Sequence, residues 1–216
     1  MSELSGRVRG VVNTPTPAGA SGRWSVRAVN KYVGAGVWPP LSLGDFESIA
    51  TVTVGSGGAA NIEFTGISGS YQHLQIRLLL RNTWGVNKRE EVRLRLNSDT
   101  GSNYARHGLE GDGSSAGAFG SASQTSMGAG TLGGDGLTAS TFSAGVIDIL
   151  DYANTSKTKT VRVLSGVDGN GEGWLWIRSG LWNNASAVTT ITLSSDNGQT
   201  LKQYSRASLY GVIRNG

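Results

Sequence analysis

The sequence contains no cysteine. Disulfides, zinc sites built from thiolates and cysteine nucleophiles are therefore excluded. Secreted domains often use disulfides, so their absence favours assembly in a reducing cytoplasm. The opening residues, MSELSGRVRG, lack the apolar stretch of a signal peptide. No apolar run approaches the roughly 20 residues of a membrane helix, so we expect a soluble protein made in the cytosol.

Charge is also scarce in this chain. Charged residues make up 16% of it, against a usual share of about a quarter. The formal net charge is +4, and the basic residues are spread through segments such as VRLRLN (92–97) and TVRVL (160–164). Nucleic-acid binding usually shows as a clustered basic patch with aromatic residues. The composition therefore argues against a nucleic-acid partner.

Glycine is what the chain has in excess, with 33 glycines in 216 residues, about twice the usual share of about 7%. Hydrophobic residues still make up 38% of the chain. This content, together with the low net charge, is not the composition of a disordered protein. The excess of glycine instead predicts a folded protein with many turns between short strands.

The segment RWSVRAVNKYVGAGVWPP (23–40) differs from the rest. Valines recur at helical spacing between a suitable N-cap, Ser25, and a suitable stop, Gly34, so we expect a helix of two to three turns. The prolines that follow force an extended exit. We expect residues 1–45 to be a docking arm, although the segment could instead cover its own domain. The expected docking residues are Trp24, Val26, Val29, Tyr32, Val33, Trp38, Pro39 and Pro40.

From about residue 46 the hydrophobic periodicity becomes two, which is typical of a strand with one buried face. In VRLRL (92–96), for example, apolar and basic residues alternate. Many short antiparallel strands with Gly-rich turns predict an all-β fold, an antiparallel β-sandwich that is jelly-roll-like, over residues 46–216. The expected strands are 48–54, 60–66, 73–81, 91–97, 103–111, 141–151, 159–166, 173–182, 188–195 and 203–214.

Short Gly-rich segments between these strands are expected to be turns. GSGG (55–58), DGNGEG (168–173) and SDNG (195–198) each predict a β-hairpin. In the longest stretch of small residues, 111–136, the scattered Phe119, Met127 and Leu132 suggest a long loop or a thin strand that packs against its neighbours. We expect a surface loop that a partner subunit orders.

Possible metal and catalytic groups have simpler explanations. Asp168, Asn170 and Glu172 resemble the start of a calcium loop, but its twelfth position is Ser179 instead of an acid. A turn accounts for these residues, so we expect no metal and no cofactor. Asp148 and Asp168 could hydrolyse a glycan only if they faced each other in a cleft. Without a catalytic motif, we expect that the protein is not an enzyme.

Three tryptophans are the best candidates for contact with a ligand. Trp84 lies in the polar loop 82–90, while Trp174 and Trp176 are two apart on one strand and therefore share a face. If that face is turned inward, they belong to the core. If it is turned outward, they form a sugar-stacking platform or a subunit interface. A carbohydrate-binding module is therefore one possible function.

Two stretches resemble a domain of small virion proteins of tailed bacteriophages: FESIATVTVGSGGAANIEFTGISGSYQHLQIRLLLRN (46–82) and LRLNSDTGSNYARHGLEGDGSS (94–115). The segment 23–40, with its W-S-x-R and G-x-W-P core, resembles a short element near the start of phage tail-associated proteins. The resemblance covers residues 23–115. It implies a tail, minor tail or fibre-like structural protein, and it supplies no catalytic motif.

The resemblance and the composition together predict a homo-oligomer, with a trimer as the expected number, that docks on other virion proteins and displays its sandwich outward. A tail protein would touch the host surface, including its glycans, through exposed loops such as 82–90. A capsid decoration protein would clamp head subunits instead, and the sequence leaves both placements open. We expect the protein to reside in the virion after assembly in the host cytoplasm, without a nucleic-acid or membrane partner.

Overall fold

The structure is a computed structural model that describes residues 6–8, 11–13, 24–37, 46–85 and 88–213. The chain divides into two compact units, Met1–Gly44 and Asp45–Gly216. The sequence placed this boundary one residue later, after residue 45. Each unit is described separately below.

The N-terminal unit contains a small antiparallel pair, β1 (Gly6–Val8) and β2 (Val11–Asn13), and the helix α1 (Val26–Gly34). The predicted helix and its cap are confirmed, because Ser25 Oγ accepts a hydrogen bond from the Ala28 backbone N–H at 3.2 Å. In the part of the chain that the structure describes, no helix is long and apolar enough to cross a membrane.

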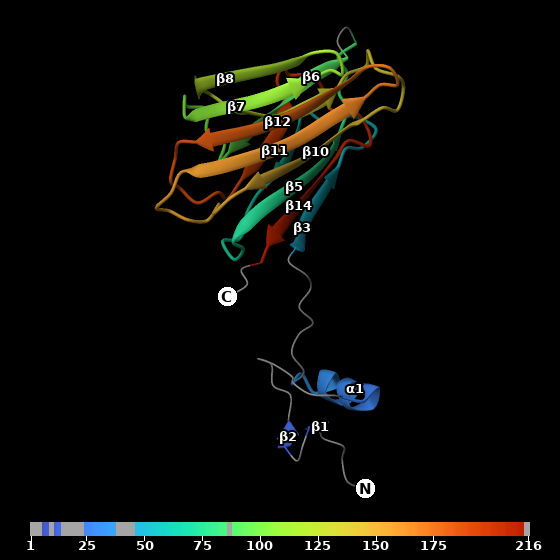
Figure 1. The fold of residues 1–216 in the computed structure, drawn as a ribbon, viewed down its shortest axis with the longest axis vertical. Helices are drawn as coiled ribbons and strands as arrows, with labels where there is room; N and C mark the ends of the chain where they lie inside the picture. The colour runs from blue at the N-terminus through green and yellow to red at the C-terminus, as the bar shows by residue number, and fades with distance from the viewer. Residues whose placement is uncertain (1–5, 9–10, 14–23, 38–45, 86–87, 214–216) are drawn as a thin grey trace. The chain divides into compact units, whose positions relative to one another are not determined.

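The second unit is built on an eight-stranded antiparallel sheet, which faces the viewer in Figure 1. Its strands follow in the spatial order β3 (Phe46–Thr53), β14 (Arg206–Val212), β5 (His73–Leu80), β10 (Ser143–Ile149), β11 (Lys159–Asp168), β12 (Gly173–Trp182), β7 (Tyr104–Gly111) and β8 (Ala116–Gln124).

A four-stranded antiparallel sheet packs behind it, in the order β4 (Asn61–Phe64), β13 (Ile191–Ser195), β6 (Arg89–Leu96) and β9 (Met127–Gly133). Alternate residues of both sheets point into a shared core, as Val92, Leu94 and Leu96 do in β6. The predicted all-β antiparallel sandwich is therefore confirmed, and all ten expected strands are present.

Four strand pairs nest inside one another along the chain. β3 pairs with β14, β4 with β13, β5 with β10, and β6 with β9. The pairs alternate between the two sheets, as they would if one long hairpin were folded over itself. Two further hairpins, β7–β8 and β11–β12, extend the larger sheet beyond this nested set.

Two of the three predicted hairpins are wrong. GSGG (55–58) joins β3 to β4, and SDNG (195–198) lies between β13 and β14, but in both cases the two strands belong to different sheets. Only DGNGEG (168–173) closes a hairpin, β11–β12, with Asn170 and Gly171 at positive φ. Turn chemistry predicts where the chain reverses. It does not predict whether the next strand pairs with the last or crosses to the facing sheet.

The stretch 111–136 is not the predicted surface loop but the alternative that its scattered Phe119, Met127 and Leu132 also allow, strand packed against its neighbours. This stretch forms two strands, the edge strand β8 and the strand β9. Every residue of β9 is buried, whereas β8 is largely exposed. Small residues are required in β9: a Cβ on Gly128 would overlap the side chains of Arg106 and Glu91, and Gly130 combines a φ of +120° with close contact to Ser165. Glycine here permits close packing between the sheets, instead of flexibility.

Candidate functional site

Strand β12 directs Trp174, Trp176 and Arg178 to its inward face, because residues two apart in a strand point the same way. The Arg178 guanidinium lies over Trp176, with its carbon 3.8 Å from the ring centroid. The Arg89 guanidinium lies over both tryptophans, at 5.2 Å from Trp174 and 5.3 Å from Trp176. Side chains therefore alternate between aromatic and cationic, as cation–π contacts favour.

The series continues onto the two outermost strands of the eight-stranded sheet. Phe119 of β8 lies under Arg178 at 4.7 Å and under Arg106 of β7 at 5.8 Å. We call the whole series, Trp174, Arg89, Trp176, Arg178, Phe119 and Arg106, the arginine–tryptophan ladder. Its members come from β12, β7 and β8 of the eight-stranded sheet, except Arg89, which comes from β6 of the facing sheet. β7, β8 and β12 lie beyond the nested strand pairs.

Two nearby carboxylates pair with the three cations of the ladder and neutralise them in part. Glu91 accepts hydrogen bonds from Arg106 and, at 2.5 Å, from Arg178. Glu110 lies 3.3 Å from Arg89. Burial lowers the pKa of the Arg178 guanidinium, and the Glu91 carboxylate acts in the opposite direction.

A pocket of 550 Å³ opens beside the ladder, and we call it the ladder pocket. The structure brings the three tryptophans singled out from the sequence to its wall. Trp84 and Trp174 are half-buried, while Trp176 is buried. The pocket wall includes Trp84, Trp174, Trp176, Arg89, Glu90 and Asp196.

None of the charged residues of the pocket wall was singled out from the sequence, and Glu90 is the most deeply buried of them. Its side chain is buried, and its carboxylate accepts hydrogen bonds from Asn82 Nδ2, Ser195 Oγ (2.6 Å) and the Asn197 backbone N–H. Among the residues described, no cation forms an ion pair with it. The alternation in β6 indicates the burial of Glu90, because Glu90 lies two and four residues before the buried residues Val92 and Leu94.

One indole donor also stands out beside the pocket. Within the described residues, Trp176 Nε1 is buried and has no hydrogen-bond partner. Unsatisfied buried donors are costly in a folded protein, so each one requires an explanation.

The opposite, solvent-facing side of the eight-stranded sheet carries an apolar patch, next to which Arg77 pairs with Val146. Outward residues of neighbouring strands meet in one row: Leu164 pairs with Ile177, which pairs with Leu109. About half or more of each of these side chains is exposed, at 52%, 53% and 60%. Val146 and Ala118 extend the row, and Leu79 and Leu175 lie in the next row. We call this surface the apolar outer face.

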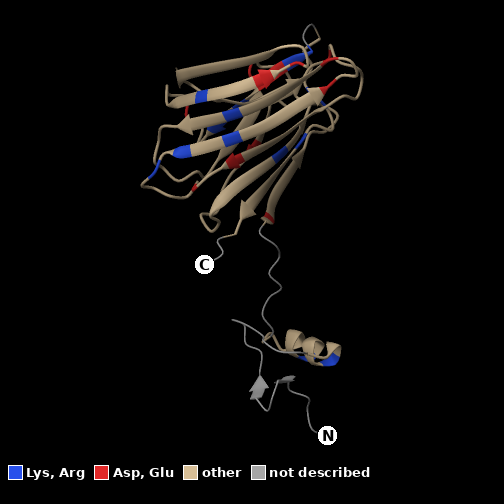
Figure 2. Cartoon of the chain, viewed as in Figure 1, with Lys and Arg blue, Asp and Glu red and all other residues tan. Residues whose placement is uncertain are grey.

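Polar groups bound the apolar outer face at its two ends. Arg162 and His107 lie toward the start of β11, while Asp168 and Asp112 lie at the far end. Figure 2 shows an acidic residue at the far end of β11 and basic residues nearer its start. The apolar centre is therefore bounded at one end by Asp168 and Asp112, and at the other by Arg162, His107 and Asp148, whose carboxylate lies 3.6 Å from the Arg162 guanidinium.

The two carboxylates considered for glycan hydrolysis do not face each other. Asp148 pairs across β10 and β11 with Arg162. Asp168 follows Arg162 by six positions on the same strand, a distance of about 20 Å at the usual rise per residue. This separation is too long for a pair of hydrolytic carboxylates.

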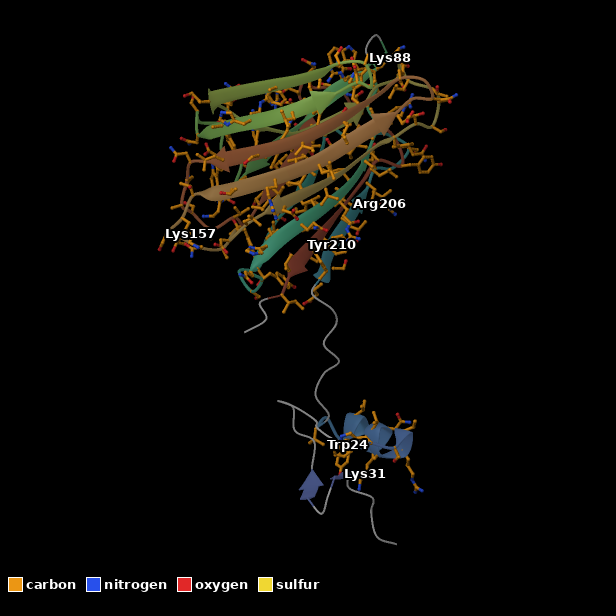
Figure 3. All side chains as sticks on the ribbon, viewed as in Figure 1. Trp24, Lys31, Lys88, Lys157, Arg206 and Tyr210 are labelled. Atoms are coloured by element: carbon orange, nitrogen blue, oxygen red, sulfur yellow. The ribbon has the colours of Figure 1, made fainter. Side chains whose placement is uncertain are left out.

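The docking residues predicted in the N-terminal unit are partly described. Trp24 packs edge-to-face on Tyr32, with ring centroids 5.6 Å apart, and Figure 3 labels Trp24 beside α1. No residue of α1 is buried, and Val26 and Val33 are the most exposed of its valines, at 77% and 56%. Trp38, Pro39 and Pro40 lie outside the described residues.

Comparisons with known proteins do not assign the chain to a family. No protein-family model matches it, and no curated protein matches it. The resemblance to phage virion proteins therefore stays a prediction.

Proposed function

We propose that the protein is a structural component of a bacteriophage virion, associated with the tail or its fibres, that self-associates through its sandwich and docks through its N-terminal unit. The resemblance of residues 23–115 supports the phage assignment. The four nested strand pairs support the jelly-roll description, because a jelly roll wraps one long antiparallel hairpin into two sheets. Jelly rolls are common in viral capsid and lectin domains.

The apolar outer face carries the proposal. Monomeric soluble proteins rarely expose a contiguous apolar patch of large side chains, and such patches commonly mark interaction surfaces. Here Leu109, Leu164 and Ile177 are adjacent and well exposed on regular strands. Their positions are held by backbone pairing, so the surface is preformed for association.

A second copy of the same chain is the occupant that this face fits. Arg162 and Asp168 lie at opposite ends of one strand. A two-fold axis in the plane of the face and perpendicular to the strands would lay the apolar row Leu109, Ile177 and Leu164 of one copy on the same row of the other. It would also bring the Arg162–Asp148 pair of each copy toward Asp168 of the other. Such a self-complementary contact makes a dimer, whereas the trimer expected from the sequence needs a head-to-tail contact.

The helix α1 supports docking on a different partner. It exposes Val26 and Val33, contains the bases Arg27 and Lys31, and has no acidic residue in its sequence. An amphipathic helix of this kind fits an apolar groove. We propose that the groove belongs to another virion protein and has an acidic rim.

Light scattering on the purified protein tests the self-association. We expect a mass of about twice the 22.5 kDa of one chain, as a two-fold contact requires, and a return to the single-chain mass in Ile177→Glu. Thr65→Glu, at an exposed site after β4, should keep the mass of the unmodified protein. A monomeric unmodified protein, or an Ile177→Glu variant of unchanged mass, would contradict the interface.

Immunogold labelling tests the virion role. An antibody against the sandwich is applied to particles produced from the genome that encodes the chain. We expect label on the tail or its fibres, while label over the head would make the protein a capsid decoration protein. The double variant Val26→Asp, Val33→Asp should lose incorporation, unlike Asn30→Asp at another exposed helix position. If no particle carries label, the proposed virion role is wrong.

A further inference from the structure

We propose that the ladder pocket binds a neutral saccharide of one or two rings. This site lies on the inward side of β12, whereas the apolar outer face lies on its other side. The inference is therefore independent of the structural role proposed above.

Aromatic surface is the first feature that points to a sugar. Trp84 and Trp174 keep part of their side chains exposed at the pocket wall, and Trp176 lies buried between two guanidinium groups. Sugar rings present an apolar C–H face, which stacks on indole, and a rim of hydroxyl groups. Trp84 and Trp174 offer the stacking surface. The Trp84 backbone N–H donates a hydrogen bond to Asn82 Oδ1, and Trp174 is fixed by the pairing of β12 with β11.

Most charges around the pocket already have an ion-pair partner, which favours a neutral ligand; among the described residues Glu90 is the exception, and its carboxylate is held by hydrogen bonds alone. Lys88 pairs with Glu172, Arg89 with Glu110, and Asp196 with Arg93. Glu91 is engaged by Arg106 and Arg178. A charged ligand would have to displace one of these pairs, which carries a cost in desolvation. A polyhydroxylated neutral ligand leaves them intact.

Hydrogen-bonding capacity remains for the hydroxyl groups of such a ligand. A carboxylate offers about four acceptor positions, and Glu90 uses three of them, for Asn82, Ser195 and the Asn197 backbone. One acceptor position is therefore left on a side chain that is already held rigidly. A rigid, preformed acceptor lowers the entropic cost of binding.

The buried donor Trp176 Nε1 lies in a residue of the pocket wall and has no partner among the described residues. Protein atoms cover this nitrogen, so a ligand hydroxyl group reaches it only if a neighbouring side chain moves. The pocket volume of 550 Å³ lies within the range of about 300–1,000 Å³ that is usual for small-molecule sites. This volume has room for one or two sugar rings.

Titration with defined sugars tests the proposal. Glucose, galactose, N-acetylglucosamine, maltose and chitobiose are each titrated into the full-length protein up to about 10 mM, while tryptophan fluorescence and saturation-transfer NMR are recorded. We expect at least one of them to bind. Trp174→Ala should weaken that binding about tenfold or more, the factor that about 1.4 kcal/mol gives, and Trp84→Ala should also weaken it.

Leu175→Ala is the matched control, because Leu175 neighbours Trp174 on β12 but points to the outer face. It should bind the sugar as the unmodified protein does. Glu90→Gln keeps the shape of the side chain and should weaken binding. Its amide NH₂ faces a hydrogen-bond donor where the carboxylate accepted, so we expect a lower thermal midpoint in a protein that is still folded. Far-UV circular dichroism of every variant shows whether it is folded.

Three results would overturn the proposal. The first is that none of the five sugars binds the unmodified protein. The second is that folded Trp174→Ala and Trp84→Ala both bind the sugar with unchanged affinity. The third is that choline chloride binds in place of the sugars, since that would make the tryptophans and Glu90 a site for an organic cation.

Discussion

Arg178 donates a hydrogen bond to Glu91 at 2.5 Å inside the sandwich, and the Arg178 side chain is only 3% exposed. Breaking a buried ion pair leaves its partner charge uncompensated, which is strongly destabilising. We predict that Glu91→Ala lowers the free energy of unfolding by about 3 kcal/mol. Urea denaturation measures the change.

The matched control for this pair is Asp196→Ala, which breaks the more exposed pair between Asp196 and Arg93. Exposed ion pairs contribute little, so the loss should stay below about 1 kcal/mol. If Glu91→Ala and Asp196→Ala lower the free energy of unfolding equally, the arginines of the ladder are exposed to water and the prediction is wrong.

Lys159 is fully buried, and its ammonium group donates hydrogen bonds to the backbone carbonyls of Asn154, Lys157 and Ala185 at 2.6–3.0 Å. Lys159→Met removes the donors and leaves three carbonyls short of a partner. We predict a loss of about 3 kcal/mol in the free energy of unfolding, since each unsatisfied group costs about 1–3 kcal/mol. Thermal and urea unfolding report the change.

Lys157→Met serves as the control for Lys159→Met, because the Lys157 side chain is exposed and pairs with Asp151 at the surface. We expect it to change stability by less than about 1 kcal/mol. A comparable loss in both variants would show that the carbonyl cluster of Lys159 adds nothing to folding.

Asp99 gives the stability a defined pH dependence. Hydrogen bonds, above all from Trp182 Nε1 at 2.6 Å, hold the pKa of Asp99 below its ordinary value. Because the folded pKa is lowered, this stabilisation is present above the unfolded pKa of about 3.9 and is lost as the pH falls through the folded value. Asp99→Asn should therefore be less stable than the unmodified protein at pH 7, and the difference should shrink toward pH 3.

The pH series is measured by urea unfolding of both proteins. A difference between Asp99→Asn and the unmodified protein that stays constant from pH 7 to pH 3 would show that the Asp99 charge is not what stabilises the fold.

Gly180 faces Met127 across the two sheets, and a Cβ at this position would overlap the Met127 sulfur. Because Met127 is buried, it cannot move into solvent. We predict that Gly180→Ala destabilises the fold by about 1–3 kcal/mol through overpacking, and that adding Met127→Ala makes the effect of Gly180→Ala smaller. Gly55→Ala, where a Cβ meets nothing within 4 Å, is the control for the substitution itself.

An additive double variant would argue against the Gly180 prediction. If Gly180→Ala costs the same with Met127 and with alanine at position 127, the two residues do not share the space that the packing assigns to them.

Hydrophobic periodicity and capping residues, which are local features of the sequence, were sufficient to predict the strands and the helix. The alternation in β6 and the capped helix at Val26–Gly34 depend on neighbours within a few residues, so the sequence predicted them correctly. The stretch 111–136 was misread because glycine and alanine show no hydrophobic alternation. Their burial in β9 depends on Arg106, Glu91 and Ser165 from other strands.

The ladder pocket shows the same division. Trp174 and Trp176 were expected to share a face because they are two apart, but nothing local indicated that Trp84 would join them. Trp84 lies about 90 positions earlier, and its place follows from the order of strands in two sheets. Glu90 was visible as an acid in a buried phase, although its partners Asn82 and Ser195 were not.

By itself, the sequence determined that the chain is all-β with a short capped helix, because helix and strand periodicities are properties of successive residues. Only the tertiary structure decided which strands pair, which turns close hairpins and which side chains meet in the ladder pocket. Strand pairing joins segments that are distant in the chain, and its register is set by packing across both sheets at once. Those contacts exist only after the whole sandwich has assembled.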